Sequence, residues 1–345
     1  MFVRWDNLTT AAEGARRLPG YREPAAIRTF DAPEAMDIRF YEVHGRSALN
    51  RVPDKSAMPF RWTINPYRGC SHACQYCFAR PTHTYLGLNA GRDFEREIVV
   101  KVNVPEVLRA ELARPSWKRE HVALGTNTDP YQWVEGRYKL MPKIWRALGD
   151  SRTPCSVLTK SPLVLRDLEL LQEIRPRTGV TASLSVPTLD ESAWRSTEPH
   201  TPHPRARLEA VAELNRAGIP TGILIAPLMP GINDAPEQVE AILTRAAEAG
   251  AVSAGGVALH LRGEVRDVFF GWLREHRPDL VDRYEELYRR GAYAPRDERR
   301  RLAALVRLPG VAPQGFLRSI DPPLPSGGRG GPDPTREAPT QTSLF

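Results

Sequence analysis

The sequence predicts an α/β fold in which helices cover a parallel sheet, and three observations lead to this prediction. Between residues 60 and 262, six short runs rich in β-branched and apolar residues alternate with segments of helical period. The run 222–228 is almost continuously apolar, which is typical of a parallel strand buried on both faces. This repeated alternation of strand and helix favours parallel strands joined by helical crossovers.

Strands are expected at six places in this region: 61–67, 121–127, 155–160, 179–186, 220–228 and 252–261. Two of the helices between them have well-marked ends. One, at 204–217, begins at Pro204, which suits a first helical position, and ends before Gly218. The other, at 235–249, follows the capping residue Asp234 and ends before Gly250. Both have one apolar face, which should pack against the sheet.

The rest of the chain differs in composition. Residues 1–55 are polar without a clear period and are expected to form an N-terminal extension, followed by the α/β domain at 56–262. Residues 263–320, rich in arginine, predict a C-terminal helical segment. In the tail at 321–345, ten of 25 residues are Pro or Gly, which predicts a disordered tail.

Composition narrows the class of protein. The chain has 345 residues and 48 Lys and Arg against 41 Asp and Glu, a net charge of +7 that weakly favours anionic partners. Its start lacks an apolar core of signal-peptide length, and its most apolar stretch, 221–232, is too short to span a membrane. Three of its four cysteines fall between residues 70 and 77, unlike a disulfide framework. We therefore expect a cytoplasmic protein without membrane segments.

The clustered cysteines are Cys70, Cys74 and Cys77, in a C-x3-C-x2-C spacing. Neighbouring thiolates can hold a soft metal centre. Structural zinc sites usually have four ligands in C-x2-C pairs, and this sequence has no second pair. Three thiolates suit a [4Fe-4S] cluster with one iron open to a substrate or cofactor, and three unrelated buried cysteines are the alternative. His72, inside the loop, is expected to pack or hydrogen-bond rather than to act as a ligand.

With the aromatic Tyr76 before its last cysteine, the motif resembles that of the radical S-adenosylmethionine (radical SAM) enzymes. Further motifs resemble the branch of this superfamily that includes spore photoproduct lyase, especially its uncharacterised actinobacterial members. These motifs are NPYRGCSHACQYCFAR at 65–80, TDPYQ at 128–132, TKSP at 159–162 and PGIND at 230–234. The likeness covers about residues 45–270 and implies a partial (β/α)6 barrel of the TIM type, with the cysteine loop after its first strand.

The resemblance also implies cofactors and chemistry. Cys70, Cys74 and Cys77 would ligate a [4Fe-4S] cluster whose open iron binds S-adenosylmethionine. Reductive cleavage of that cofactor would give a 5′-deoxyadenosyl radical that abstracts hydrogen from a substrate. The electron would come from an external donor of flavodoxin or ferredoxin type. The cofactors supply this chemistry, while the protein binds, orients and excludes water.

Seven other residues are candidates for binding S-adenosylmethionine: Tyr76, Phe78, Thr126, Asn127, Lys160, Ser183 and Ser185. By the resemblance, Tyr76 and Phe78 would lie beside the adenine, and Lys160 would bind the carboxylate. Thr126 and Asn127 stand where many family members have a Gly-Gly-Glu segment for the amino group. The two serines alternate along a strand, so they share a face that would carry the ribose. The alternative for Tyr76 is a core aromatic residue, and that for Lys160 is an ion pair at the rim of the barrel. The alternative for the two serines is ordinary packing of small residues.

Four further residues lie near the expected barrel. Glu198, His200 and Arg207 follow the fourth strand and are weaker candidates for its mouth, and we expect them in solvated loops. Cys155 begins the third strand, remote from the mouth, and is expected to be a buried, inert thiol. Spore photoproduct lyase has a cysteine near the end of its second strand that returns hydrogen to the product. The matching stretch here, 125–129, has none, which argues against photoproduct repair itself.

The last five residues, 341–345, resemble the pentapeptide by which bacterial DNA polymerases and repair proteins bind the sliding clamp. Gln341 would hydrogen-bond at the rim of an apolar pocket that takes Leu344 and Phe345. A chance tail sequence is the alternative. A clamp partner would place the protein near DNA.

The sequence thus predicts a radical SAM enzyme acting on DNA or on a nucleotide-containing substrate, as a lyase or as a nucleic-acid-modifying enzyme. Radical chemistry on RNA, a peptide or a small metabolite is the first alternative. The second is a non-catalytic iron–sulfur protein that binds DNA or senses redox state. Formation of 5′-deoxyadenosine separates this second alternative from the enzymes.

Overall fold

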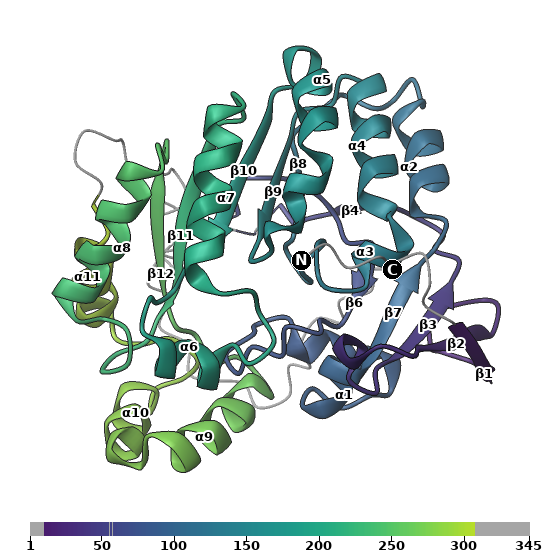
Figure 1. The fold of residues 1–345 in the computed structure, drawn as a ribbon. Helices are drawn as coiled ribbons and strands as arrows, with labels where there is room; N and C mark the ends of the chain where they lie inside the picture. Colours follow the sequence, from purple (N-terminus) through teal and green to yellow (C-terminus); the bar gives the residue numbers. More distant parts are fainter. Residues whose placement is uncertain (1–9, 55, 57, 308–345) are drawn as a thin grey trace, which may run out of the picture.

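The computed structural model describes residues 10–54, 56 and 58–307, and its largest part is a seven-stranded sheet (Figure 1). The strand order is β12-β11-β10-β9-β8-β5-β4. All neighbours from β5 to β12 are parallel, and β4 adds antiparallel to β5. The strands span Leu49–Arg51 (β4), Trp62–Ile64 (β5), Val122–Leu124 (β8), Cys155–Thr159 (β9), Val180–Ser185 (β10), Thr221–Leu228 (β11) and Ala254–Ala258 (β12). The predicted class, with six parallel strands, is confirmed.

Helices in the crossovers lie along the outside of this curved sheet (Figure 1). They are α2 (Val104–Leu112), α4 (Leu140–Asp150), α5 (Leu168–Thr178), α7 (Pro204–Arg216) and α8 (Pro236–Glu248). Their apolar faces and the strands form one large core around Trp145 and Tyr131. The bounds of α7 and α8 agree closely with the helices expected at 204–217 and 235–249, because proline and glycine mark their ends.

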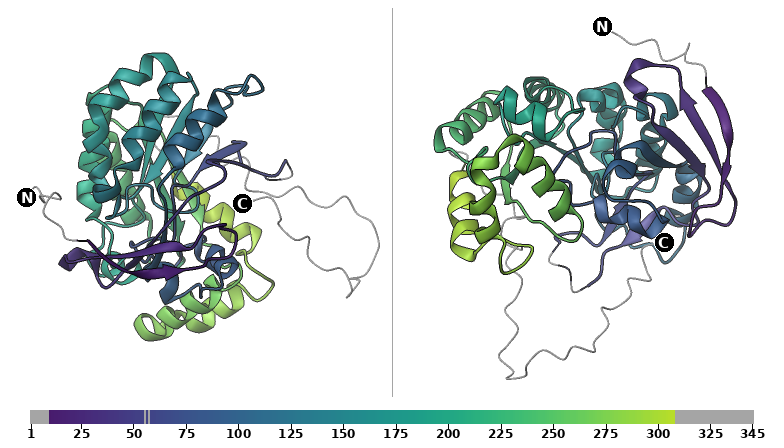
Figure 2. Two further views of the ribbon diagram at one scale, coloured as in Figure 1. Left: turned by 90° about the vertical axis from the view of Figure 1, so that its right-hand side faces the viewer. Right: turned by 90° about the horizontal axis from the view of Figure 1, so that it is seen from below.

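A second sheet, which the sequence did not indicate, joins the N-terminal segment to the first crossover (Figure 2). Its order is β1-β2-β3-β7-β6, with β3 parallel to β7. The strands span Thr10–Arg16 (β1), Ala25–Phe30 (β2), Arg39–Val43 (β3), Tyr67–Arg68 (β6) and Glu97–Lys101 (β7). Ile98 and Val100 face the main core, whereas Val99 faces a smaller cluster with Tyr41 and Val43. Strand β7 therefore ties the N-terminal segment to the region of the cysteines.

The remaining helices lie mostly beyond the carboxyl ends of the parallel strands or against β12. They are α1 (Arg92–Arg96), α3 (Glu135–Tyr138), α6 (Glu191–Thr197), α9 (Val265–His276), α10 (Val281–Leu287) and α11 (Arg296–Leu305), with 3-10 helices at Pro33–Ala35 (η2), Arg80–Leu86 (η3), Pro162–Asp167 (η4) and Pro278–Leu280 (η5). Among the helices described, none is long and apolar enough to cross a membrane. The expected tail at 321–345, with Gln341, Leu344 and Phe345, lies outside the described residues.

Candidate functional site

The cysteine loop follows the first parallel strand and is held in shape by a buried arginine. Arg80 is fully buried, and its guanidinium donates to the carbonyls of Ala73 and Cys74 at 3.2 and 2.8 Å. The same group donates to the carbonyls of Ala90 and Gly91 at 3.1 and 3.0 Å. A planar fork of five donors can hold two backbone segments together in this way. The chain itself thus fixes the conformation of the loop between the cysteines.

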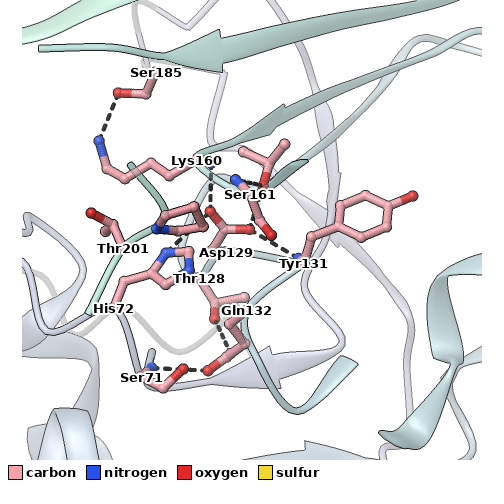
Figure 3. Close-up of polar contacts among 12 residues, drawn as sticks. Ser71, His72, Thr128, Asp129, Tyr131, Gln132, Lys160, Ser161, Ser185 and Thr201 are labelled. Atoms are coloured by element: carbon pink, nitrogen blue, oxygen red, sulfur yellow. Dashed lines mark hydrogen bonds and ion pairs between the residues drawn. The ribbon is translucent and has the colours of Figure 1, made fainter. Parts of the chain in front are cut away.

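The start of the loop is held by Gln132, from the segment after β8 (Figure 3). Its side-chain amide donates to the carbonyl of Gly69 at 3.2 Å and accepts from the N–H of Ser71 at 2.9 Å. Thr128 donates its hydroxyl to the same Gly69 carbonyl at 2.7 Å. Gly69 has a φ of +82°, and a Cβ there would lie 2.7 Å from the carbonyl oxygen of Phe94. Residues 128–132 therefore support the start of the cysteine loop.

The three thiols have the surroundings that cluster ligands need. Cys70 and Cys74 are buried, and Cys77 is partly buried. Burial raises the pKa of all three thiols, and nearby carboxylates and thiols raise the pKa values of Cys70 and Cys74 further. A bound metal centre reverses this effect, because its positive charge deprotonates the thiols that coordinate it. The donor set fits a cationic cluster held between the three sulfurs.

The placement of the metal-binding side chains indicates which kind of metal centre the loop could hold. In the part of the chain that the structure describes, no three His, Cys, Asp or Glu side chains are arranged to hold one metal ion. A [4Fe-4S] cluster is held by thiolates on separate irons. Its ligands therefore need not converge on one point.

Lys160 directly follows β9 and reaches a cluster of polar groups (Figure 3). Its Nζ lies 2.7 Å from Ser185 Oγ and 2.7 Å from a carboxylate oxygen of Glu198. The ring centroid of Tyr76 is 5.6 Å from the same nitrogen, and the Tyr76 hydroxyl donates to Glu198. Three residues predicted to bind S-adenosylmethionine are thus brought together from the cysteine loop, β9 and β10.

The expectation that Glu198 and Arg207 lie in solvated loops is wrong. Both are fully buried, and the Arg207 guanidinium donates to Glu198 at 2.7 Å and to the carbonyl of Ser185 at 2.9 Å. The segment after β10 folds inwards, and Gln75 in the cysteine loop donates its N–H to the carbonyl of Thr197 at 2.9 Å. Residue type predicts exposure for such charges, but mutual pairing makes their burial possible. His200, by contrast, is exposed.

The charges of this cluster do not balance. Burial raises the pKa of Glu198, but Arg207 and Lys160 outweigh it and lower that pKa to about 2. One ionised carboxylate therefore faces two cations. The Arg207 side chain is fully buried, whereas the Lys160 side chain is 14% exposed. The excess positive charge is consequently accessible at Lys160, where it can attract an anionic group.

Asp129 connects the loops after β8 and β9 (Figure 3). Its carboxylate accepts from the Thr159 hydroxyl at 2.6 Å and from the Lys160 N–H at 2.8 Å. His72 is buried in the cysteine loop with Nδ1 3.4 Å from the same carboxylate. Burial raises the pKa of Asp129, but His72 and these hydrogen bonds lower it below its ordinary value. The sequence placed Asp129 in a motif without a role, and the structure shows that it holds the backbone of Lys160.

The other candidates lie on neighbouring strand ends. The N–H of Asn127 and the hydroxyl of Thr126 donate to Asn65 Oδ1 at 3.1 and 3.3 Å. Ser183 is partly buried on β10, two residues before Ser185 and hence on the same face. Phe78 is 52% exposed and lies with its ring centroid 5.9 Å from that of His260. Unlike Tyr76, it is a surface residue.

Cys155 begins β9 and is fully buried in the main core. Burial raises its pKa to about 12. A thiol of this kind stays protonated at neutral pH and is therefore a weak nucleophile and ligand. Its position at the amino end of β9 agrees with the expectation of a packing residue.

Comparison with known proteins identifies the family. The sequence pattern of the radical SAM superfamily matches residues 64–246, from β5 into α8. The chain belongs to the radical SAM superfamily. It is therefore an enzyme of the radical SAM type, and the cysteine loop and strand ends described above lie within the matched region or at its edges.

The chain is also similar to uncharacterised proteins and to a protein of known structure. The chain is 48% identical over 308 residues to an uncharacterised protein of Mycobacterium tuberculosis, covering 88% of this chain and 91% of that protein. It is 29% identical over 174 residues to an uncharacterised protein of Methanocaldococcus jannaschii, covering 50% and 62%. Spore photoproduct lyase complexed with dinucleoside spore photoproduct superposes with a TM-score of 0.58 at 17% identity, covering 77% of each chain. This last likeness confirms the predicted fold.

Proposed function

We propose that Cys70, Cys74 and Cys77 hold a [4Fe-4S] cluster and that Lys160 helps to bind S-adenosylmethionine beside it. The observation that carries this proposal is the charge excess at Lys160, which contacts the same carboxylate as Tyr76 of the cysteine loop. When bound, the two cofactors supply one-electron reduction and a carbon radical that abstracts hydrogen. Lys160 and Ser185 would bind the cofactor carboxylate, and Glu198 would keep both Lys160 and the Tyr76 hydroxyl in place.

The remaining predicted contacts complete the cofactor site. Thr126 and Asn127 follow β8, and Asn65 holds them through two hydrogen bonds. They would accept from the cofactor amino group, while Ser183 would contact the ribose. Tyr76 would present its ring to the adenine, with Phe78 outside it at the surface. The buried lining of the site would exclude water, which protects a radical from side reactions.

We further propose that the substrate is DNA or another nucleotide-containing molecule. Three observations support this: the net charge of +7, the fold shared with spore photoproduct lyase, and the clamp-like sequence of Gln341, Leu344 and Phe345. Photoproduct repair itself is not proposed, because 125–129 contains no cysteine. The proposal includes a cytoplasmic setting and an external flavodoxin-like or ferredoxin-like donor, since unpaired clustered thiols need reducing conditions.

Anaerobic reconstitution of the whole chain with iron and sulfide, followed by S-adenosylmethionine and dithionite, tests the proposal. We expect iron binding and 5′-deoxyadenosine formation, and we expect both to be lost when any one of the three cysteines is replaced by alanine. Cys155→Ala is the matched control and should retain both. An intact cluster without 5′-deoxyadenosine would show that the chain is a non-catalytic iron–sulfur protein.

Lys160 has its own test within the same assay. Lys160→Met should keep its iron and its cluster spectrum but need at least tenfold more S-adenosylmethionine for half-maximal 5′-deoxyadenosine formation, about 1.4 kcal/mol of binding. Lys143→Met, at an exposed position of α4, is the control. If both variants needed the same S-adenosylmethionine concentration for half-maximal activity, Lys160 would not be a cofactor-binding residue.

Deuterium transfer tests the substrate class: label from a deuterated substrate should appear in 5′-deoxyadenosine, and label from 5′-deuterated S-adenosylmethionine should appear in the substrate only if the cofactor is regenerated. Oligonucleotides, RNA, peptides and small metabolites are offered in parallel. Label exchange with an oligonucleotide would support the nucleic-acid substrate, and exchange confined to the other classes would contradict it.

A further inference from the structure

Three aromatic side chains lie together just beyond the carboxyl end of β12. The ring centroid of His260 is 5.9 Å from that of Phe78 and 5.7 Å from that of Tyr293. Phe78 is 52% exposed and Tyr293 is 47% exposed. Single exposed aromatic residues are common on protein surfaces, but here two from distant parts of the chain flank one ring. We call Phe78, His260 and Tyr293 the aromatic patch.

The main chain fixes two of these rings relative to one another. His260 and Tyr293 form an antiparallel bridge, and the N–H of Leu261 donates to the carbonyl of Ala292 at 2.8 Å. The segment that carries Tyr293 is therefore tied to the end of β12. Rings that are already in position lose little conformational freedom when a ligand binds, and this favours affinity.

The surroundings of the aromatic patch indicate what it could bind. Phe78 directly follows Cys77, so the patch adjoins the cysteine loop. Arg262 is exposed, and burial and the nearby charge of Arg262 lower the pKa of His260, so its ring is uncharged at neutral pH. Flat, neutral rings beside a cation are typical of surfaces that bind single-stranded nucleic acid, whose flat bases are joined to an anionic backbone.

We propose that the aromatic patch binds a base of single-stranded DNA by stacking and that Arg262 attracts the backbone beside it. This inference rests on the nucleotide-containing substrate proposed above and adds a place for one of its bases. Three partly exposed rings offer far less area than the roughly 800 Å² that each partner buries in a stable protein–protein interface. A base, in contrast, needs only one ring face. A base held here would bring the neighbouring nucleotides towards the cysteine loop.

Fluorescence anisotropy of a labelled short oligothymidylate, titrated with the purified full chain, tests the patch. Tyr293→Ala and Phe78→Ala should each bind about fivefold or more weakly than the wild type, because each removes a stacking ring. Tyr293→Phe keeps the ring, and Tyr85→Ala removes a tyrosine of similar exposure, 51%, outside the patch, so both should bind like the wild type. Equal thermal unfolding midpoints check that the variants are folded. Wild-type affinity in both Tyr293→Ala and Phe78→Ala would overturn the proposal.

A second comparison separates stacking from attraction to the backbone. An abasic oligomer of the same length and charge should bind the wild type about fivefold or more weakly than the oligothymidylate, and equal affinity would overturn the stacking. No binding of either oligomer would contradict the nucleic-acid substrate as well, whereas normal binding that neither Tyr293→Ala nor Phe78→Ala weakens would overturn the patch alone. Self-association that Tyr293→Ala abolishes, with unchanged oligonucleotide affinity, would instead assign the patch to a contact between copies of the chain.

Discussion

Glu198 is a buried carboxylate whose neighbours depend on it. Its removal leaves Arg207, which is fully buried, without its ionic partner. Breaking a buried pair by removing one member costs about 3–5 kcal/mol, so we expect Glu198→Gln to lower the free energy of unfolding by that amount. Urea unfolding at pH 7 measures it. The control Glu191→Gln, which breaks an exposed pair with Arg195, should leave the stability unchanged.

The pH dependence of the stability of Glu198→Gln distinguishes loss of the ion pair from loss of packing. The Glu198 pKa is lowered to about 2 in the folded chain, from an ordinary value of 4.5. Its contribution is therefore present above pH 4.5 and is lost as the pH falls from 4.5 towards 2. Glu198→Gln should lose less stability than the wild type over this interval. Parallel acid unfolding of both proteins would contradict the ion-pair role.

Residues of the site differ in how far the sequence could predict them. The cysteines and Lys160 lie in short motifs that resemble those of the family, so the sequence alone could single them out as candidates. Glu198 and Arg207 carry no such signal, because their burial arises only when the segment after β10 folds against the cysteine loop. Because both side chains are charged, the sequence predicted that Glu198 and Arg207 would be exposed to solvent. A pair of opposite charges nine residues apart is too common a pattern to predict a buried bridge.

At the level of single elements, the end of β8 depends on one glycine. Gly125 has a φ of +85°, and a Cβ there would lie 1.9 Å from the carbonyl oxygen of Leu158 in β9. Gly125→Ala must therefore displace a neighbouring strand, and we expect a loss of more than about 3 kcal/mol in the free energy of unfolding. Urea unfolding of the purified variant measures this loss.

Gly179 provides the matched control for this substitution. It has a φ of +72° at the end of α5, but a Cβ there meets nothing within 4 Å. Gly179→Ala should therefore cost only the conformational strain of about 1–2 kcal/mol. Similar losses at Gly125 and Gly179 would show that contact with β9 is not what requires glycine at 125.

The strands also show which elements the hydrophobic pattern of the sequence could predict and which it could not. Strands β10 and β11 were predicted almost to the residue, because β11 is nearly continuously apolar and β10 alternates apolar with small polar residues. Strand β5 was expected over 61–67 but spans only Trp62–Ile64, since the chain leaves the sheet to build the cysteine loop. The N-terminal sheet was missed because β3 pairs with β7, more than 50 residues later in the sequence. Pairing over such a distance leaves no local period.

For the whole molecule, the cysteine loop contacts parts of the fold that are far apart in the sequence. Cys70 and Cys77 pack with Phe94 beside the N-terminal sheet. Cys74 and Tyr76 pack with the apolar faces of α9 and α10, and Gln75 bonds to the end of α6. The site is therefore complete only when the N-terminal sheet, the parallel sheet and the C-terminal helices are all in place.

The stability of the whole chain should depend on pH through Lys101. Its pKa is about 7 in the folded chain against 10.5 for an ordinary lysine, so the unfolded chain binds more protons between these two values. Stability should rise with pH in this window, by about 1.4 kcal/mol per pH unit from this group, and the full penalty should remain below pH 7. Urea unfolding from pH 6 to 9 in phosphate-free buffer measures the rise.

The groups that face Lys101 do not obscure this dependence. Burial raises the pKa of Tyr21, which packs in the same small apolar cluster as Val99 of β7, above its usual value. Lys101→Met should therefore flatten the profile between pH 7 and 9, whereas Lys143→Met should not. A steep profile in Lys101→Met would contradict the assignment of this pH dependence to Lys101.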